Sequence, residues 1–359
     1  MSAPAAGAAR LDAAYVLPLR RDRAAAAETA ELAAYLRRLG AIVAELVVVD
    51  GSPPAAFAAH RAALAGTPAR HLAPHADLRF RMGKVNGVLT GARECSRERV
   101  VIADDDVRYD EASLRRAVRL LDAADLVRPQ NHFQPPVWHA RWDTARSLLN
   151  RVFTGDAAFP VGDFPGTLAV RRSALLAAGG YDGDVMFENL ELMRTVRAAG
   201  GVVLTPLGLY VARRPPSAAH FASQRVRQAY DDFAIPARMA TWLALGPLAL
   251  TLARRAPRAL ATGALAAIGA AEAGRRRAGG AAVFPVSGSL LAPAWLAERA
   301  VCSWLAVGAR LRGGVRYRGG RLRRAATPMR RLRAARGTEA DRLVGAVAER
   351  PDLRPPAAA

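Results

Sequence analysis

The sequence has very little lysine and cysteine. Of its 52 Lys and Arg residues only Lys84 is a lysine, so any step that needs an ammonium side chain depends on that one position. The two cysteines, Cys95 and Cys302, lie far apart without metal-type spacing, which argues against a disulfide framework or a structural zinc site and favours a reducing compartment. The sequence also lacks a Gly-x-Ser-x-Gly elbow, zinc-type His spacing and a secretory pattern at its start.

The positive charge is unevenly distributed. The formal net charge is +21, and residues 236–336 hold 19 arginines with only Glu272 and Glu298 as acids, whereas residues 1–235 are nearly neutral for their size. The arginines alternate with apolar runs instead of with aromatic or Gly-rich RNA-binding patterns. We therefore expect a membrane, and no nucleic acid, as the partner of this region.

Residues 1–235 alternate between strand-like and helix-forming segments. A strand–helix–strand order implies a parallel sheet, so the predicted fold class is α/β, with a mostly parallel sheet flanked by helices. Strands are expected at 13–19, 44–52 and 99–106, and helices at 24–40, 83–94 and 111–124.

Four aspartates follow these strands, namely Asp50 and the triplet Asp104 to Asp106. Ligands of open α/β sheets bind at the carboxyl ends of the strands. On extended backbone, Asp104 and Asp106 share a face while Asp105 points away. Paired carboxylates need a cation, and hard oxygen ligands suit Mg²⁺ or Mn²⁺. The alternative is that the triplet caps the helix expected at 111–124.

This arrangement resembles a family 2 glycosyltransferase of the GT-A fold, over residues 13–235 and more loosely to about 326. The resemblance implies that Asp50 contacts the nucleotide base and that Asp104 and Asp106 form the DxD motif, which holds the metal and the donor. It favours a UDP-sugar as the donor, with Mg²⁺ or Mn²⁺ as the cofactor.

The segment that contains the lone lysine, "GKVN", is similar to a GKxxAxN-like element of the same family, with Gly83, Lys84 and Asn86 at the matching positions. The resemblance places Lys84 and Asn86 at the nucleotide or its diphosphate. A compact ammonium is not interchangeable there with a planar guanidinium. The alternative is that the position of a single lysine reflects drift.

Residues 162–201 resemble the acceptor-side block of the family. The family usually reads Glu-Asp where this sequence has Glu188-Asn189. Because an amide cannot accept the acceptor's proton, Glu188 is the nearest substitute for the general base, with Asp163 as second choice. The alternatives are that Glu188 and Glu191 stabilise a helix start, or that the protein binds a donor without catalysis.

Residues 223–232 resemble the QxxRW element of the membrane-associated hyaluronan and cellulose synthases and ceramide glucosyltransferases. Gln224 and Arg227 match, and Gln228 stands at the tryptophan position. The resemblance places Gln224 near the donor and implies that Arg227 stabilises the departing diphosphate. The missing tryptophan argues against processive polymerisation, and a solvated Gln/Arg-rich helix is the alternative.

Three apolar segments follow, at 239–255, 258–277 and 281–314. The first is apolar for fifteen residues, whereas a span needs about 20. We expect short spans, a hairpin or helices in the headgroup plane, and an Ala-rich soluble helical domain is the alternative. Flanking arginines favour the cytoplasmic side and anionic lipids.

The sequence thus predicts a nucleotide-sugar-binding catalytic domain at 1–235, a membrane-associated region at 236–326 and a mobile tail at 327–359. The resemblance implies a metal-dependent, inverting glycosyltransferase on the cytoplasmic membrane, with its catalytic domain facing the cytoplasm and a lipid or envelope glycan as acceptor. A nucleotidyltransferase is less favoured because "LPLRRDRAAAAE" lacks a Gly-rich phosphate loop. A basic nucleic-acid-binding protein is the remaining alternative.

Overall fold

A central sheet organises the part of the chain that the computed structural model describes, residues 9–154, 166–317 and 319–335. Its strands, in spatial order, are β3 (Arg70–Leu72), β2 (Val43–Asp50), β1 (Leu11–Leu19), β4 (Arg99–Ala103), β8 (Thr167–Arg171), β6 (Leu126–Val127) and β9 (Val203–Leu204). The first four run parallel, β8 is antiparallel to both neighbours, and β9 is parallel to β6. The prediction of a mostly parallel α/β sheet is confirmed.

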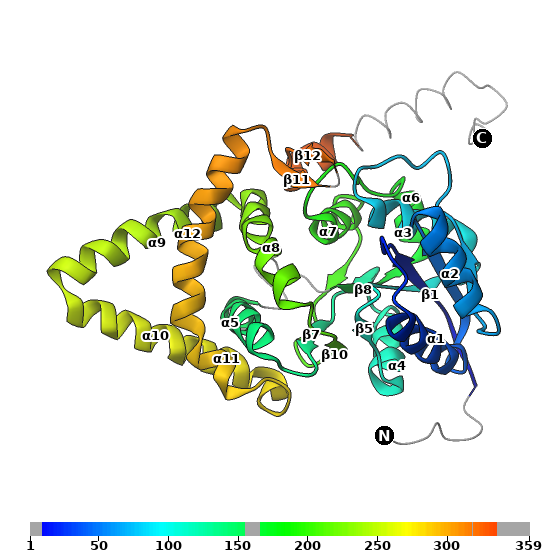
Figure 1. Ribbon diagram of the computed structural model, residues 1–359, viewed down its shortest axis with the longest axis horizontal. Helices are drawn as coiled ribbons and strands as arrows, with labels where there is room; N and C mark the ends of the chain where they lie inside the picture. The colour runs from blue at the N-terminus through cyan, green and yellow to red at the C-terminus, as the bar shows by residue number, and fades with distance from the viewer. Residues whose placement is uncertain (1–8, 155–165, 318, 336–359) are drawn as a thin grey trace, which may run out of the picture.

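Helices cover both faces of this sheet (Figure 1). Alternate residues of β1 point to opposite faces, so Tyr15 packs with α1 (Ala26–Gly40) and α4 (Glu111–Leu120), whereas Val16 packs with α3 (Gly83–Glu94). The other helices of this part are α2 (Pro54–Leu64), α6 (Arg172–Ala177) and α7 (Glu188–Ala198). Each predicted strand and helix has a counterpart in the structure, with ends that differ by a few residues.

Two glycines let α3 lie unusually close to β1. A Cβ on Gly87 would meet Pro18 Cβ at 2.8 Å, and one on Gly91 would overlap Val16 Cγ1. Because a side chain at either position would push the helix outward, this pair of glycines fixes the start of α3 beside the carboxyl end of β1. Lys84 is the second residue of that helix.

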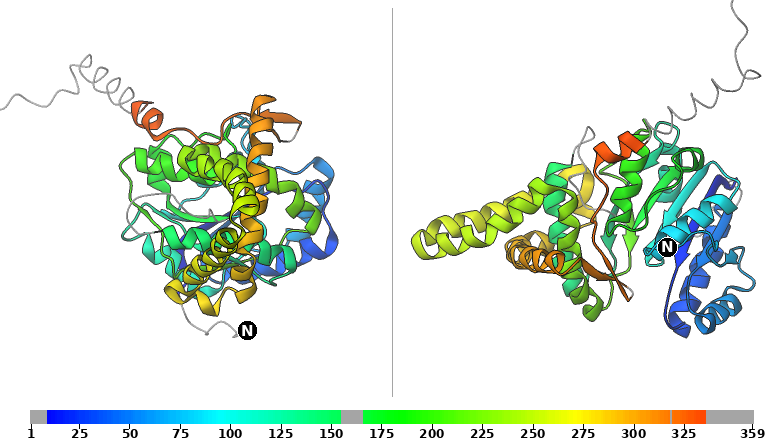
Figure 2. Two further views of the ribbon diagram at one scale, coloured as in Figure 1. Left: turned by 90° about the vertical axis from the view of Figure 1, so that its left-hand side faces the viewer. Right: turned by 90° about the horizontal axis from the view of Figure 1, so that it is seen from above.

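The remaining helices form a separate layer. A small sheet, β5 (Val107–Arg108), β10 (Tyr210–Arg213) and β7 (Gln130–Phe133), leads to α5 (Trp138–Phe153) and α8 (Ala218–Tyr230). Beyond them lie α9 (Pro236–Arg255), α10 (Pro257–Arg276), α11 (Val286–Leu290) and α12 (Ala292–Leu311). Figures 1 and 2 show α9 and α10 meeting at a tip that projects away from the sheet, while α12 crosses between their bases.

The expectation of membrane-crossing helices is not met. Among the described residues, no helix combines the length and the apolar character that crossing a bilayer requires. The fifteen-residue apolar run of 239–255 is interrupted by Pro247 and ends at Arg254 and Arg255, which explains why it falls short. Of the predicted tail at 327–359, residues 336–359 lie outside the described residues.

The chain after α12 returns to the layer of the central sheet through β11 (Val315–Tyr317) and β12 (Gly320–Leu322). Met186 N donates to Arg324 O at 2.9 Å, and Phe187 N donates to Ala325 O at 2.8 Å. The buried Glu191 accepts a hydrogen bond from Thr327 N at 2.6 Å. This C-terminal segment therefore supports the start of α7, which carries Glu188.

Candidate functional site

A polar pocket of about 380 Å³ opens at the carboxyl ends of β1, β2 and β4. Pro18 and Leu19 end the first strand, Gly51 follows the second, and the aspartate triplet follows the third. This is the edge at which ligands of open α/β sheets bind. The rest of the lining comes from other segments: Arg20, Pro74, Gly83, Lys84, Asn86, Arg213, His220 and Tyr317.

The aspartate triplet lies on a tight turn rather than on extended backbone. Val107 N donates to Asp104 O at 3.1 Å, which closes the turn after β4. Asp104 and Asp106 nevertheless face the same partner, since Arg213 Nη2 lies 3.8 Å from Asp104 Oδ2 and Arg213 Nε lies 2.7 Å from Asp106 Oδ2. Asp105 pairs instead with Arg21 at 2.8 Å. The predicted orientation is thus correct, but the turn and not strand alternation produces it.

The triplet does not cap the following helix. Asp110 holds that position, and its Oδ1 accepts a hydrogen bond from Ser113 N at 2.7 Å at the start of α4. The capping alternative for Asp104 to Asp106 is therefore wrong, and their carboxylates remain directed at the pocket.

Lys84 connects the triplet to the start of α7. Its Nζ lies 2.7 Å from Asp104 Oδ1 and 2.9 Å from Glu188 Oε1, and it donates to Asn189 Oδ1 at 3.4 Å. Burial alone would lower the pKa of Lys84, but Asp104 and Glu188 raise it well above the usual range. The ammonium is therefore charged at every physiological pH.

One carboxylate oxygen of the triplet fits a metal ion. Asp106 Oδ1 is buried and has no hydrogen-bond partner within the described chain. Burial raises the pKa of Asp106, and the neighbouring Asp104 and Asp105 add to this against the opposing effect of Arg213. His220 lines the same pocket and contributes an imidazole side chain to it. No group of three or more His, Cys, Asp or Glu side chains in the described segments is arranged to hold a metal by itself, so a cation here would take further ligands from substrate and water.

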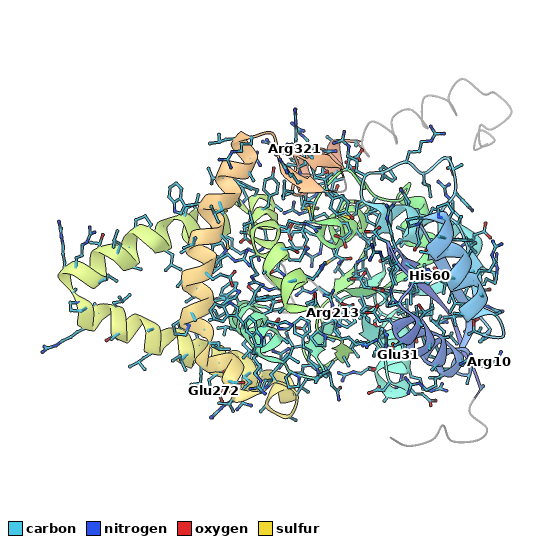
Figure 3. The ribbon with its side chains drawn as sticks, viewed as in Figure 1. Arg10, Glu31, His60, Arg213, Glu272 and Arg321 are labelled. Atoms are coloured by element: carbon cyan, nitrogen blue, oxygen red, sulfur yellow. The ribbon has the colours of Figure 1, made fainter. Side chains whose placement is uncertain are left out.

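Asp50 is enclosed within the protein. Only 1% of it is exposed, and its Oδ2 lies 2.8 Å from His60 Nδ1 and 3.0 Å from His71 Nε2. Its Oδ1 accepts a hydrogen bond from Ser52 N at 2.8 Å. Burial alone would raise the pKa of Asp50, but hydrogen bonds from His71, Ser52 and His60 lower it to about 2. His60 belongs to α2, and Figure 3 labels it on the side of the molecule where that helix lies, while Arg213 is labelled near the centre.

The other predicted site residues lie at varying distances from the pocket. Asn86 lines it, but its amide group is bonded to Phe80 N and Phe80 O, each at 3.0 Å. Arg227 stacks on Tyr317, with its Cζ 5.0 Å from the ring centre, and Tyr317 lines the pocket. Gln224 donates to Ser223 Oγ at 3.2 Å and does not line the pocket. Asp163 lies outside the described residues.

Sequence reasoning missed three residues of this pocket. Arg213 occurs among many arginines, and nothing in "YVARRPP" separates it from them. His220 has no partner at metal-type spacing, and Tyr317 lies 211 residues after Asp106 along the chain. Only the fold brings these three side chains to the aspartates, so no local pattern could have identified them.

Comparisons with known proteins give structural similarity only. No protein-family model matches the chain, and no curated protein sequence is significantly similar to it. Among solved structures, the mannosyltransferase PcManGT from Pyrobaculum calidifontis, in complex with GDP-Man and Mn²⁺, is similar with a TM-score of 0.47 and 21% identity, over 82% of this chain and 88% of that one. The glucosyl-3-phosphoglycerate synthase from Mycobacterium tuberculosis, in complex with Mn²⁺, UDP and glucosyl-3-phosphoglycerate, has a TM-score of 0.39 and 19% identity, over 60% and 77%.

Proposed function

We propose that this protein is a metal-dependent glycosyltransferase of the GT-A type, which transfers a sugar from a nucleoside diphosphate donor to a hydroxyl of a lipid or glycan acceptor. The observation that carries the proposal is the pocket at the strand ends. Asp104 and Asp106 face one side of it, and one oxygen of Asp106 has no hydrogen-bond partner among the described residues, while Lys84 and Arg213 supply positive charge beside them. Carboxylates and cations side by side match a metal–diphosphate pair.

The residues divide into a donor set and an acceptor set. Asp104 and Asp106 would hold Mg²⁺ or Mn²⁺ together with oxygens of the donor and water, and the ion neutralises phosphate charge when bound. Lys84 and Arg213 are placed to neutralise the remaining phosphate oxygens. Asp50 orients the end of β2 through Ser52 and His71, and we assign it an indirect part in shaping the nucleoside end of the pocket.

The reaction is a single displacement at the anomeric carbon. The acceptor oxygen forms a bond to that carbon, the bond to the diphosphate oxygen breaks with its electron pair, and the acceptor proton passes to Glu188. Displacement from the opposite face inverts the anomeric configuration. Lys84 holds Glu188 beside Asp104, so the proton acceptor and the diphosphate cations lie in one network.

We further propose that the protein acts at the cytoplasmic face of the membrane. An apolar groove of about 370 Å³ lies between α9, α10 and α12. Large apolar side chains that are more than half exposed gather on these helices, and arginines flank them. Such a surface favours anionic lipid headgroups and an acceptor with a lipid chain. The exposed residues are Leu248, Leu250, Leu265, Val301, Trp304, Leu305 and Leu311.

A panel of nucleotide sugars tests the enzyme assignment. Thermal unfolding of the full chain is followed with UDP- and GDP-sugars, with and without Mn²⁺, because a ligand that binds only the folded state raises the melting temperature. We expect a shift that requires both the sugar nucleotide and the metal and that is lost in Asp106→Asn. Asp12→Asn, an exposed carboxylate distant from the pocket, is the control. If no sugar nucleotide shifts the wild type, the proposal is wrong.

Vesicle binding tests the membrane assignment separately. The protein should sediment with vesicles that contain phosphatidylglycerol, and Leu265→Asp should weaken this without changing donor binding. Binding that persists in high salt would distinguish apolar insertion from charge attraction alone, which salt weakens. Equal sedimentation of the variant and the wild type would contradict the assigned surface.

A further inference from the structure

A second pocket lies between α5, α8, α9 and α12, beside the start of α7. Its volume is about 30 Å³, which holds one or two waters or the polar end of a larger ligand. Phe187 lines it, and the next residue, Glu188, pairs with Lys84 at the aspartate pocket. The two pockets therefore adjoin through the first residue of α7.

Buried hydrogen-bond donors in this second pocket lack acceptors. Trp295 and Arg299 are each 2% exposed, and neither the indole Nε1–H nor the guanidinium Nε–H finds an acceptor in the described part of the chain. The Nε–H of Arg238, which also lines the pocket, likewise has no acceptor among the described residues. Two buried acceptors of the same lining, Gln228 Oε1 and Asp231 Oδ1, also have no partner in the described residues. Buried polar atoms are almost always paired, so three donors and two acceptors around one small space indicate a ligand that both accepts and donates hydrogen bonds.

The charge of the pocket favours the same kind of ligand. Its lining includes three guanidinium groups, from Arg146, Arg238 and Arg299. Asp232 is shared by two of them, at 2.5 Å from Arg238 and 3.5 Å from Arg299. Burial raises the pKa of Asp231 to about 8, with contributions from Asp232 and Glu188, so that this group carries a proton at neutral pH. Arg146 is itself paired with Asp143 at 3.0 Å, so with Asp231 protonated the three guanidinium groups exceed the two carboxylates, Asp143 and Asp232, by one positive charge, which favours an anion.

We propose that this pocket binds a phosphate group of the acceptor substrate. A phosphate offers enough oxygens to accept from Trp295, Arg238 and Arg299 together, and arginines are well suited to it. The inference rests on the proposed function, because the bound phosphate would place the rest of the acceptor beside Glu188. The phosphate of a soluble ester and that of a lipid headgroup share this chemistry.

Calorimetric titration with inorganic phosphate tests the site in the full chain. Trp295→Phe removes the indole N–H and leaves a smaller aromatic ring in the same apolar cluster, so it should fold and should bind phosphate on the order of tenfold more weakly. Trp138→Phe is the matched control, since Trp138 lies at the start of α5, a helix that also borders the pocket, but its side chain is exposed and does not line the pocket. A second arm replaces phosphate with vesicles containing phosphatidic acid, compared with phosphatidylcholine alone.

The outcomes separate this inference from the proposed function. Weakened phosphate binding in Trp295→Phe supports a soluble phosphate ester, and weakened binding to phosphatidic acid alone supports a lipid phosphate. If Trp295→Phe matches the wild type in both arms, or if the wild type binds neither probe, the inference is wrong. Asp106→Asn should keep this phosphate binding while losing metal-dependent nucleotide binding, so each site can fail without the other.

Discussion

The Nζ atom of Lys84 lies 2.7 Å from Oδ1 of Asp104, so the only lysine of the chain is ion-paired with the first aspartate of the triplet. The same atom lies 2.9 Å from Glu188 Oε1. One ammonium thus joins the carboxyl end of β4 to the start of α7, and the close packing of α3 on β1 at Gly87 and Gly91 holds it there. The carboxylates of Asp104 and Glu188 are therefore neutralised by the same ammonium group.

Replacing Lys84 with methionine should destabilise the protein. Asp104 and Glu188 would face each other, largely buried and without their cation, and loss of one partner from a buried ion pair costs about 3 kcal/mol. Urea unfolding measures the change. Adding Glu188→Gln to Lys84→Met should recover part of the loss, and a double-mutant cycle with no coupling would contradict the assigned network. Lys84→Arg should keep most of the stability but weaken donor binding.

Alanine at position 91 should also reduce stability. The new methyl group would overlap Val16 Cγ1 in the buried contact between α3 and β1, and overpacking of this kind costs about 1–3 kcal/mol. Gly269→Ala on α10 is the control, because a methyl group there has nothing within 4 Å and should stabilise its helix by up to about 1 kcal/mol. Equal changes in stability at the two positions would show that helix propensity, and not packing against β1, determines the effect of alanine at position 91.

Glutamine at position 188 should abolish transfer while leaving donor binding measurable. The amide cannot take the acceptor's proton, and loss of a general base lowers the rate by about 10² to 10⁴-fold. The measurements are turnover and donor affinity on the same preparations. Glu98→Gln is the control. Glu98 lies just before β4, at the opposite end of that strand from the pocket, and its carboxylate accepts hydrogen bonds from Ser173. If the variant transfers sugar at the full rate, Glu188 is not the general base. If the wild type itself shows no transfer, the result supports the alternative that the protein binds a donor without catalysis.

The sheet and the aspartate motif could be predicted because their signals are local. Apolar runs at 13–19 and 44–52 with a strong helix former between them specify a parallel unit, and a parallel unit places Asp50 and Asp104 at one edge. Local patterns also predicted the helix that carries Lys84. The enclosure of Asp50 by His60 and His71 could not be read in this way, because those contacts depend on how α2 and β3 pack.

The C-terminal third was predicted less well, because its structure also depends on contacts between elements and not on local patterns. Apolar runs flanked by arginines look alike whether they cross a bilayer, lie on it or pack on a protein core. Here one face of α12 is buried through Trp295 and Ala306, whereas Trp304 and Leu305 on the same helix are exposed. Composition does not show which side of a helix another element covers. For the same reason, the loose resemblance that extends to about residue 326 did not predict the contacts of Arg324 and Thr327 with the segment around α7.

Asparagine at position 231 should make stability less dependent on pH. Burial, Asp232 and Glu188 raise the pKa of Asp231 to about 8 in the folded protein, against the opposing effects of Arg227 and Arg299, whereas an unfolded aspartate titrates near about 3.9. Between these values the folded state holds a proton that the unfolded state has released, so wild-type stability falls as the pH rises from about 4 to about 8.

The variant removes this titration. Asp231→Asn should match the wild type near pH 4 and exceed it at neutral pH by an amount on the order of 4 kcal/mol, because the neutral amide is never ionised in the buried site. Urea unfolding of both proteins from pH 4 to pH 8 measures the difference, and taking that difference cancels the titration of the groups that do not interact with Asp231. Asp122→Asn, at an exposed carboxylate paired with Arg99, should show no such divergence. A constant difference across the range would mean that Asp231 is ionised in the folded protein and that its pocket is wetter than the packing around Trp295 and Arg299 indicates.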